Sequence, residues 1–187
     1  MFERFTEDAR DVVKVAVAYG QREGVRSVGA EHLLLALLDR EASRASFALA
    51  ALGLTGRRAS VREALSEARR RGGLTRAETD ALAGLGIDVG EIVSRVEEAH
   101  GAGAMAGDRR DGGRRSGRRT FSRGAKDVLV GALRTAVDRR ERHIGDEHIL
   151  LALTLRPGVP AEVLADHGVT HESLLRVLYG DGTALAG

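Results

Sequence analysis

One segment occurs twice in the chain, and this duplication constrains the fold more than any other feature. Residues 29–37 read GAEHLLLAL, and residues 145–153 read GDEHILLAL. In each copy a glutamate and a histidine stand at the start of a run that is apolar on nearly every side, which predicts a short buried helix with a polar first turn. The chain is therefore expected to be all-α and to contain two related helical units that bury their apolar faces against each other.

The segments around each copy repeat as well. Thr6 and Ser122 each precede an apolar stripe with three- and four-residue spacing, and threonine and serine are favoured at the N-cap of a helix. A third apolar stripe in each unit is followed by a glycine, which commonly ends a helix. Amphipathic segments near 61–70 and 173–178 then complete two four-helix units.

The units are separated by two further segments. Residues 78–96 repeat the helix, glycine, helix pattern of residues 47–65, which predicts a spare pair of helices that could fill the groove between the units and block it. The residues after this pair lose all periodicity and are rich in glycine and arginine, which predicts a flexible linker. The expected divisions are 1–71 for the first repeat, 72–100 for the extra helical pair, 101–119 for the linker, 120–180 for the second repeat and 181–187 for a disordered tail.

Composition excludes several classes of chemistry. The chain has no Cys, so disulfides, thiolate nucleophiles and Cys-ligated metals are ruled out. The N-terminus carries charge at once, and no segment approaches the ~18 apolar residues that a membrane span needs. We therefore expect a cytoplasmic protein that is neither exported nor embedded in a membrane.

The repeated pattern is Phe-Thr/Ser-x-x-Ala, then Gly-x-Glu-His-Ile/Leu-Leu-Leu-Ala-Leu, then an apolar helix followed by glycine. It resembles the Clp repeat, the N-terminal domain of the ClpA and ClpC class of ATP-driven unfoldases, and the opening residues MFERFT look like the start of a ClpC-type chain. The resemblance covers residues 2–70 and 120–180. It implies two four-helix repeats that form one pseudo-twofold domain.

The chain also departs from that family. Ala30 replaces the usual threonine, and the extra pair and the linker are not part of the ordinary ClpC arrangement. A phosphate-binding loop needs a lysine in a glycine-rich turn, whereas Lys14 and Lys126 both stand in helical stripes. We therefore expect no ATPase module, no cofactor and no enzyme activity. The chain is similar to the free-standing Clp N-domains that actinobacteria carry beside the full unfoldase.

The resemblance implies that this protein binds arginine-phosphorylated proteins as degradation tags, and Clp adaptors as well. Phosphoarginine joins an anionic phosphoryl group to a guanidinium-like cation, so its receptor needs an anion site beside a carboxylate. Thr6 and Ser122 begin helices whose free N–H groups bind anions, and Glu31 and Glu147 can bind the cation. Matching the family motif predicts two pockets, Thr6 with Glu31 and Ser122 with Glu147. Acids stand beside Thr6 and cations beside Ser122, so the Ser122 pocket should attract phosphate better.

Simpler roles for these residues stay open. A threonine or serine at a helix start is often only a cap, worth about 1 kcal/mol, and an acid in the first turn often only favours the helix dipole. His32 and His148 each adjoin a glutamate, but adjacent helix positions do not face each other. We therefore expect packing histidines and no metal site.

Two other surfaces have predicted partners. The resemblance implies a groove between the repeats that docks adaptors and, in some actinobacterial members, cyclic-peptide antibiotics. Phe2, Phe121 and Lys126 match this groove, whereas Phe5 is expected in the core. Six arginines between residues 109 and 119 could bind nucleic acid through phosphates, but no aromatic residues stand among them to stack on bases. A solvated linker is therefore the better interpretation.

The function predicted from the sequence is a non-catalytic binding module of Clp protein quality control. It captures phosphoarginine-tagged proteins or adaptors, and either delivers them to the unfoldase or sequesters them. The alternatives are a nucleic-acid-associated protein that uses the arginine-rich linker, and a partner that docks on the Clp unfoldase and regulates it.

Overall fold

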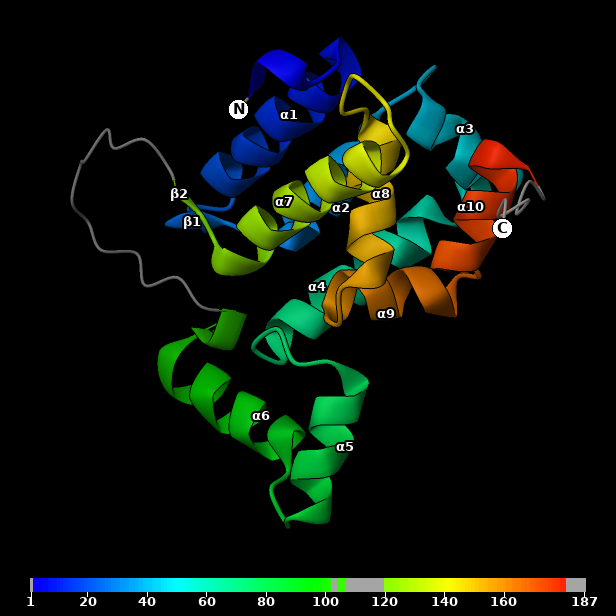
Figure 1. The fold of residues 1–187 in the computed structure, drawn as a ribbon. Coiled ribbons are helices and arrows are strands. Elements are labelled where there is room, and N and C mark those ends of the chain that lie inside the picture. The colour runs from blue at the N-terminus through cyan, green and yellow to red at the C-terminus, as the bar shows by residue number, and fades with distance from the viewer. Residues whose placement is uncertain (1, 102–103, 107–119, 181–187) are drawn as a thin grey trace.

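The computed structural model describes residues 2–101, 104–106 and 120–180, and the fold within these ranges is all-α, as predicted (Figure 1). Most of the predicted linker and the whole predicted tail lie outside the described residues. The first repeat contains η1 (Phe2–Arg4), α1 (Glu7–Arg22), β1 (Ser27–Val28), α2 (Ala30–Asp39), α3 (Arg44–Ala51), η2 (Thr55–Arg57) and α4 (Arg58–Arg70). The second repeat contains β2 (Thr120–Phe121), α7 (Arg123–Asp138), α8 (Asp146–Leu155), α9 (Val159–Asp166) and α10 (His171–Tyr179).

The helix starts follow from the predicted caps. The Thr6 hydroxyl accepts a hydrogen bond from the Ala9 N–H at 3.2 Å, and the Ser122 hydroxyl accepts one from the Ala125 N–H at the same distance. Each bond satisfies one of the backbone donors that a helix start leaves free. Both predicted N-caps are therefore confirmed.

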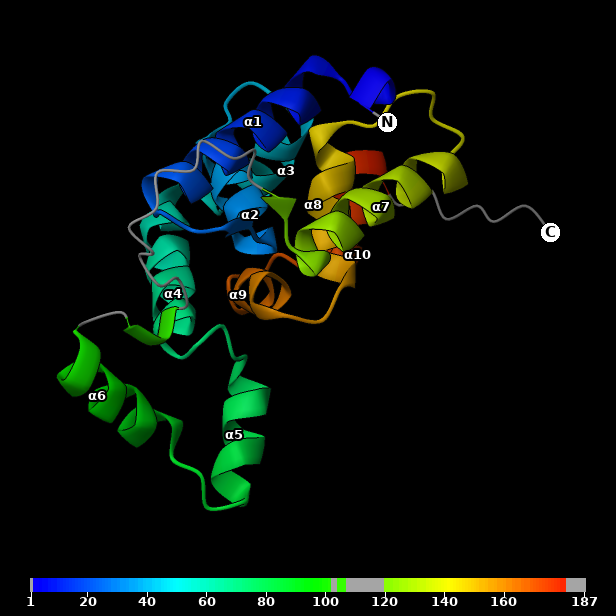
Figure 2. The ribbon, with the colours of Figure 1, turned by 90° about the vertical axis from the view of Figure 1, so that its left-hand side faces the viewer.

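The centre of the molecule is formed by α2 and α8, the two copies of the duplicated segment. Leu33, Leu34, Ile149 and Leu150 are fully buried, and α1 packs on α2 as α7 packs on α8. The two central helices also contact each other, so the repeats share one aliphatic core (Figures 1 and 2). This arrangement explains why both segments are apolar on all sides.

A crossed strand pairing connects the repeats, and the sequence did not predict it. β1 pairs in parallel with β2, with Ser27 opposite Thr120, and an isolated bridge joins Phe5 to Ile144. The Ser122 N–H donates to the Val28 carbonyl at 2.9 Å on one side, and the equivalent bond forms on the other side. The first helix of each repeat therefore begins beside the second helix of the other repeat.

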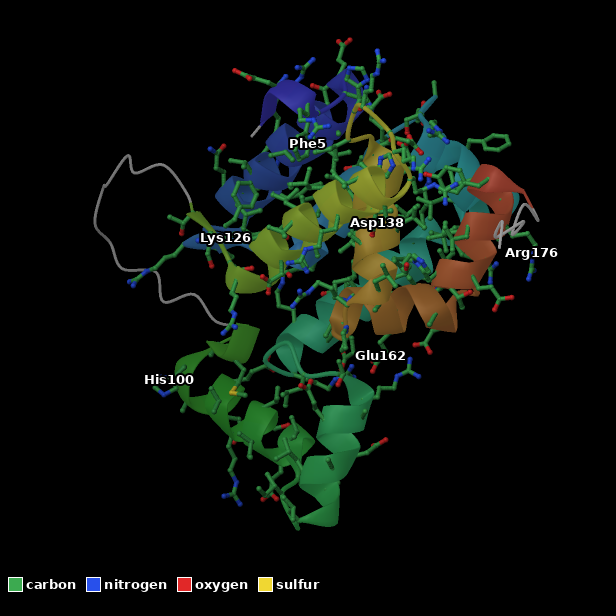
Figure 3. All side chains as sticks on the ribbon, in the orientation of Figure 1. Phe5, His100, Lys126, Asp138, Glu162 and Arg176 are labelled. Atoms are coloured by element: carbon green, nitrogen blue, oxygen red, sulfur yellow. The ribbon has the colours of Figure 1, made fainter. Side chains whose placement is uncertain are left out.

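The extra helices α5 (Arg76–Gly84) and α6 (Val89–His100) project from one end of the body (Figures 1 and 2). At the start of α5, the Arg76 N–H donates to the Glu162 carboxylate of α9 at 2.9 Å (Figure 3). The short helix η3 (Ala104–Ala106) packs on α4, although this stretch was assigned to the linker. Leu85 remains 78% exposed, so the pair adds little to the core.

Within the described ranges, no single helix has both the length and the hydropathy of a membrane span. α8 and α9 reach these values only as a pair bent by 96°.

Candidate functional site

The predicted site residues form two pockets, but their partners are exchanged. Ser122 lines a pocket with Glu31, which we call the Glu31 pocket, and Thr6 lines a pocket with Glu147, which we call the Glu147 pocket. The predicted pairs, Thr6 with Glu31 and Ser122 with Glu147, are therefore wrong. The crossed strand pairing is the cause, because it places each first helix beside the other repeat's glutamate.

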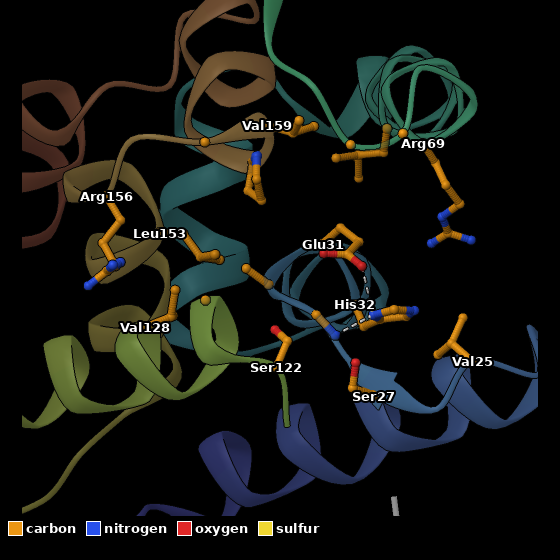
Figure 4. A pocket seen from close by; sticks show the side chains of 18 of the residues that line it. Val25, Ser27, Glu31, His32, Arg69, Ser122, Val128, Leu153, Arg156 and Val159 are labelled. Atoms are coloured by element: carbon orange, nitrogen blue, oxygen red, sulfur yellow. Dashed lines mark hydrogen bonds and ion pairs between the residues drawn. The ribbon is translucent and has the colours of Figure 1, made fainter. Parts of the chain in front are cut away.

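The Glu31 pocket is a cavity of about 490 Å³ between the starts of α2, α7 and α9 (Figure 4). The Glu31 side chain is 35% exposed and shares the cavity with Ser122 and Gly124 at the start of α7. Aliphatic side chains form much of the remaining wall. Residues 76–100 do not line this cavity, so the extra helical pair does not fill it.

Both glutamates fold back over the glycine that precedes them by two residues. A Cβ atom on Gly29 would lie 2.2 Å from the Glu31 carboxylate oxygens, and one on Gly145 would lie 2.0 Å from Glu147 Oε2. Such distances are far inside van der Waals contact, so glycine is required at both positions for the observed carboxylate placement. This requirement explains the glycine in both copies of the motif, and sequence reasoning missed it.

The adjacent histidines hold this turn in place. His32 Nδ1 accepts a hydrogen bond from the Gly29 N–H at 2.8 Å, and its Nε2 lies 2.9 Å from Glu23 Oε2, to which it donates. His148 Nδ1 accepts from the Gly145 N–H at 2.9 Å, and both histidines are almost completely buried. The prediction that these are packing histidines is confirmed.

One cluster of acidic and histidine side chains has the spacing of a metal site. Potential ligand atoms of Glu141, Glu147 and His148 lie within 4.8 Å of one another. However, His148 Nδ1 accepts from a backbone N–H, so the hydrogen of the neutral ring is on Nε2, which then has no lone pair for a metal. Burial lowers the pKa of His148 and favours this neutral form. The Arg44 guanidinium also lies beside both carboxylates.

Arg44 lines the Glu147 pocket, a cavity of about 340 Å³, and binds its carboxylates. Its Nη1 donates to Glu147 Oε1 at 2.7 Å and lies 3.6 Å from Glu141 Oε2. The Glu147 side chain is only 5% exposed, and burial raises its pKa to about 7. The Glu147 carboxylate, which was predicted to bind the cation of a ligand, is therefore almost completely removed from solvent. Asp8, which is bonded to Arg40, adds a negative charge where a phosphate would have to bind.

Three charged residues of the Glu147 pocket have uncharged counterparts in the Glu31 pocket. Counting from Gly29 and Gly145 identifies the equivalent positions around the first two helices of each repeat, and the third helices, α3 and α9, are aligned by their first residues, Arg44 and Val159. Each residue of a pair lines its own pocket. The Glu31 pocket is therefore the less charged version of the same construction. The pairs are Arg44 with Val159, Glu141 with Val25, and Asp8 with Gly124.

The residues predicted for an adaptor groove lie near the start of α7. Phe121 is half-buried against the core, and Lys126 is exposed and points away from the body (Figure 3). The side chain of Phe2 lies outside the described part of the structure. Phe5 is 3% exposed, which confirms its prediction as a core residue.

The family model described as the Clp repeat (R) N-terminal domain matches residues 4–79 and 120–184 of the chain. The ATP-dependent Clp protease ATP-binding subunit ClpA homolog of Cyanidium caldarium is 30% identical over 170 residues, which make up 90% of this chain and 15% of that protein. The chain thus spans a small part of this relative's length.

A solved structure shows the same fold. It is the crystal structure of the N-terminal domain of the caseinolytic protease associated chaperone ClpD from Arabidopsis thaliana. The match has a TM-score of 0.52 and 19% identity, and it covers 95% of this chain and 94% of that one.

Proposed function

The chain belongs to the family of Clp repeat N-terminal domains, and from this premise we propose that it is a binding module for substrates or adaptors of Clp unfoldases. In this proposal the Glu31 pocket binds phosphoarginine in tagged proteins. The module performs no catalysis itself, and its effect on degradation comes from delivering or sequestering what it binds.

One observation carries this proposal, namely that a partly exposed carboxylate and a helix start share a single cavity. The guanidinium part of phosphoarginine is a cation that Glu31 can bind through charge-assisted hydrogen bonds. The free N–H groups at the start of α7 and the Ser122 hydroxyl can bind the phosphoryl oxygens. The ligand therefore meets groups of the correct sign at both of its ends.

The charges around the start of α7 support the same choice of pocket. The first turn of α7 contains Arg123 and no acid, whereas the first turn of α1 contains Glu7 and Asp8. A dianionic phosphoryl group should be attracted to the first environment and repelled by the second. Exposed Lys126 adds positive charge one turn further along α7.

Isothermal titration with a phosphoarginine peptide tests the proposal. We expect one site per chain, no binding of the matched phosphoserine or unmodified arginine peptides, and at least tenfold weaker binding for Glu31→Gln. Glu147→Gln is the matched control and should leave the affinity unchanged. It makes the same change in the equivalent residue of the Glu147 pocket, where Arg44 already binds the carboxylate. Unchanged affinity in Glu31→Gln would refute this site.

Adaptor binding near α7 is the second candidate, and the exposure of Lys126 beside half-buried Phe121 favours it. Lys126→Glu should abolish or strongly weaken the binding of an adaptor, and it should weaken phosphoarginine binding only slightly, because Lys126 adds positive charge near the start of α7 but does not line the Glu31 pocket. Lys126→Glu should likewise weaken the binding of a cyclic-peptide antibiotic to this surface. A degradation assay with a Clp unfoldase and protease then distinguishes delivery, which accelerates loss of a tagged substrate, from sequestration, which slows it.

A hydrolase is the alternative from another functional class. Ser60 Oγ lies 2.9 Å from His167 Nε2, and His167 Nδ1 lies 2.7 Å from the Val163 carbonyl, an arrangement similar to part of a serine–histidine dyad. Ser60 is exposed, however, and the pair lines neither the Glu31 pocket nor the Glu147 pocket. We expect no turnover of an activated ester such as p-nitrophenyl acetate.

Nucleic-acid binding depends on the arginines between residues 109 and 119, which lie outside the described residues. Deletion of residues 108–119 should abolish any DNA binding and leave phosphoarginine binding unchanged. A salt-dependent affinity for DNA that disappears with this deletion would favour the alternative function.

A further inference from the structure

We propose that the Glu31 pocket contains a second subsite, which binds an apolar side chain next to the phosphoarginine. The ligand class would then be peptides in which the modified arginine adjoins leucine, isoleucine, valine or methionine. This inference depends on the proposed function of the same pocket, and it adds a sequence preference that the charged groups alone would not provide.

The subsite is an aliphatic wall formed by Val128, Leu153 and Val159. Figure 4 shows these three side chains on one side of Glu31, whereas Val25 and Arg69 lie on the other side. The wall comes from three helices, α7, α8 and α9. Val159 is half-buried and supplies most of the accessible apolar surface of this wall, whereas Leu153 and Val128 are at most 2% exposed and pack behind it.

The cavity is large enough for more than one side chain. Its volume of about 490 Å³ lies within the range of about 300–1,000 Å³ that is typical of pockets for drug-sized ligands. A phosphoarginine side chain that spans from Glu31 to the start of α7 would leave the aliphatic wall uncovered. An apolar neighbour on the peptide would cover the accessible part of this wall, chiefly Val159, and remove its apolar surface from water.

The charges near the wall are already paired. Arg156, which also lines the cavity, forms an ion pair with Asp127 at 2.9 Å, and Arg69 is paired with Glu23. Neither arginine therefore requires a second anionic group on the ligand. A side chain without charge suits this side of the pocket best.

The start of α9 fixes the wall in position. Pro160 stands in the first turn of α9, where its fixed φ angle is compatible with the helix. The equivalent position to Val159 in the Glu147 pocket is Arg44, whose guanidinium would repel an apolar side chain from that site. The preference is therefore expected of the Glu31 pocket alone.

Titration of the wild-type chain with two peptides tests this inference. Both contain one phosphoarginine, which is flanked by leucine on both sides in one peptide and by glycine on both sides in the other. We expect the glycine peptide to bind about tenfold more weakly, which corresponds to partial burial of one leucine side chain. Equal affinities would overturn the subsite but leave the proposed function standing. Failure of both peptides to bind would overturn both.

A variant locates the preference on the wall. Val159→Ser should weaken the leucine peptide about fivefold and leave the glycine peptide unchanged. Val137→Ser, a change at a valine of α7 that is 53% exposed, is the matched control and should affect neither peptide. If Val159→Ser weakened the binding of both peptides equally, the assignment of the apolar subsite to this wall would be contradicted. The comparison of peptides on the wild-type chain decides the inference if this variant does not fold.

Discussion

The Glu31 pocket and the Glu147 pocket are built from the same repeated motif, yet the Glu31 side chain is 35% exposed and the Glu147 side chain only 5%. In both pockets a glycine, a glutamate and a histidine form the same turn, with the same bond from the glycine N–H to the histidine ring. Arg44 then binds Glu147, whereas Val159 stands at the equivalent place near Glu31. The duplicated turn thus places each carboxylate beside the histidine that follows it, with Glu31 Oε1 3.2 Å from His32 Nδ1, although adjacent positions were not expected to face each other. The neighbouring helix then decides whether an arginine also binds the carboxylate.

Arg44 resembles the cationic half of the proposed ligand. Its guanidinium makes a bond of 2.7 Å to Glu147 and also lies over the Tyr179 ring, 5.5 Å from the ring centroid. Because Arg44 belongs to the same chain, a ligand at this pocket must compete with a group present at high effective concentration. The first two predictions exchange this feature between the pockets.

The largest effect is expected from Val159→Arg, which places a guanidinium at the entrance of the Glu31 pocket. The new cation should bind Glu31 and repel the guanidinium part of the ligand, and affinity for a phosphoarginine peptide should fall roughly tenfold to hundredfold. Isothermal titration measures the loss. Val137→Arg is the control for an added charge at an exposed valine, and unchanged binding in Val159→Arg would show that the two pockets are not equivalent.

The reverse change, Arg44→Ser, should open the Glu147 pocket. We expect a second and weaker binding site per chain, weaker because Asp8 still lies at the start of α1. The titration should be performed at several pH values above 8, because burial raises the pKa of Glu147 to about 7 in the wild type and the loss of Arg44, which lowers it, should raise it further. The carboxylate must be ionised to bind a cation. A stoichiometry that stays at one would indicate that Arg44 is not what closes this pocket.

Substitution by alanine should be tolerated better at Gly29 than at Gly145. Both have φ near −88°, so alanine is compatible with the backbone, and only the contact with the glutamate matters. Gly145→Ala should destabilise the protein by about 2 kcal/mol, because the buried carboxylate of Glu147 has no free space to move into.

Gly29→Ala should change the free energy of unfolding by less than about 0.5 kcal/mol, since the partly exposed Glu31 can swing outward. Its peptide affinity should nevertheless decrease. Urea denaturation of both variants measures the difference, and equal destabilisation would contradict the difference in burial between the two glutamates.

The last comparison concerns the dependence of stability on pH. The pKa of Glu147 is about 7 in the folded protein and near its ordinary value of 4.5 in the unfolded chain, so the folded state binds more protons between these values. This group therefore makes stability fall as pH rises from 4.5 to 7, by roughly 2–3 kcal/mol.

Glu147→Gln should remove this part of the pH dependence, and Glu31→Gln should retain it. The urea concentration at the midpoint of unfolding, measured at pH 5 and pH 7.5 for the wild type and both variants, tests this expectation. If the stability of Glu147→Gln fell with rising pH as steeply as that of the wild type, the pH dependence would come from another group.

Much of the fold could be predicted from the sequence, because it depends on local patterns. The caps at Thr6 and Ser122, the buried helices and the core position of Phe5 all follow from spacing and residue type. The glycine at the start of each duplicated segment was a further signal. Its close contact with the glutamate could have been suspected from its recurrence in both copies.

The pairing of the site residues could not be predicted in the same way. It depends on two-residue strands such as Ser27–Val28, which are too short to show an alternating pattern. The contact between Arg44 and Glu147 joins residues 103 positions apart and follows only from the packed fold. Long-range pairing, rather than local structure, was therefore the missing information.

The crossed strand pairs give each cavity one wall from either half of the chain. A peptide held in the Glu31 pocket would touch α2 of the first half and α7 and α9 of the second, and so would fasten the halves together. Binding of the peptide should then stabilise the whole molecule. This should be measurable as a higher melting temperature and as slower amide exchange in both central helices, α2 and α8. Neither half expressed alone would possess a complete cavity.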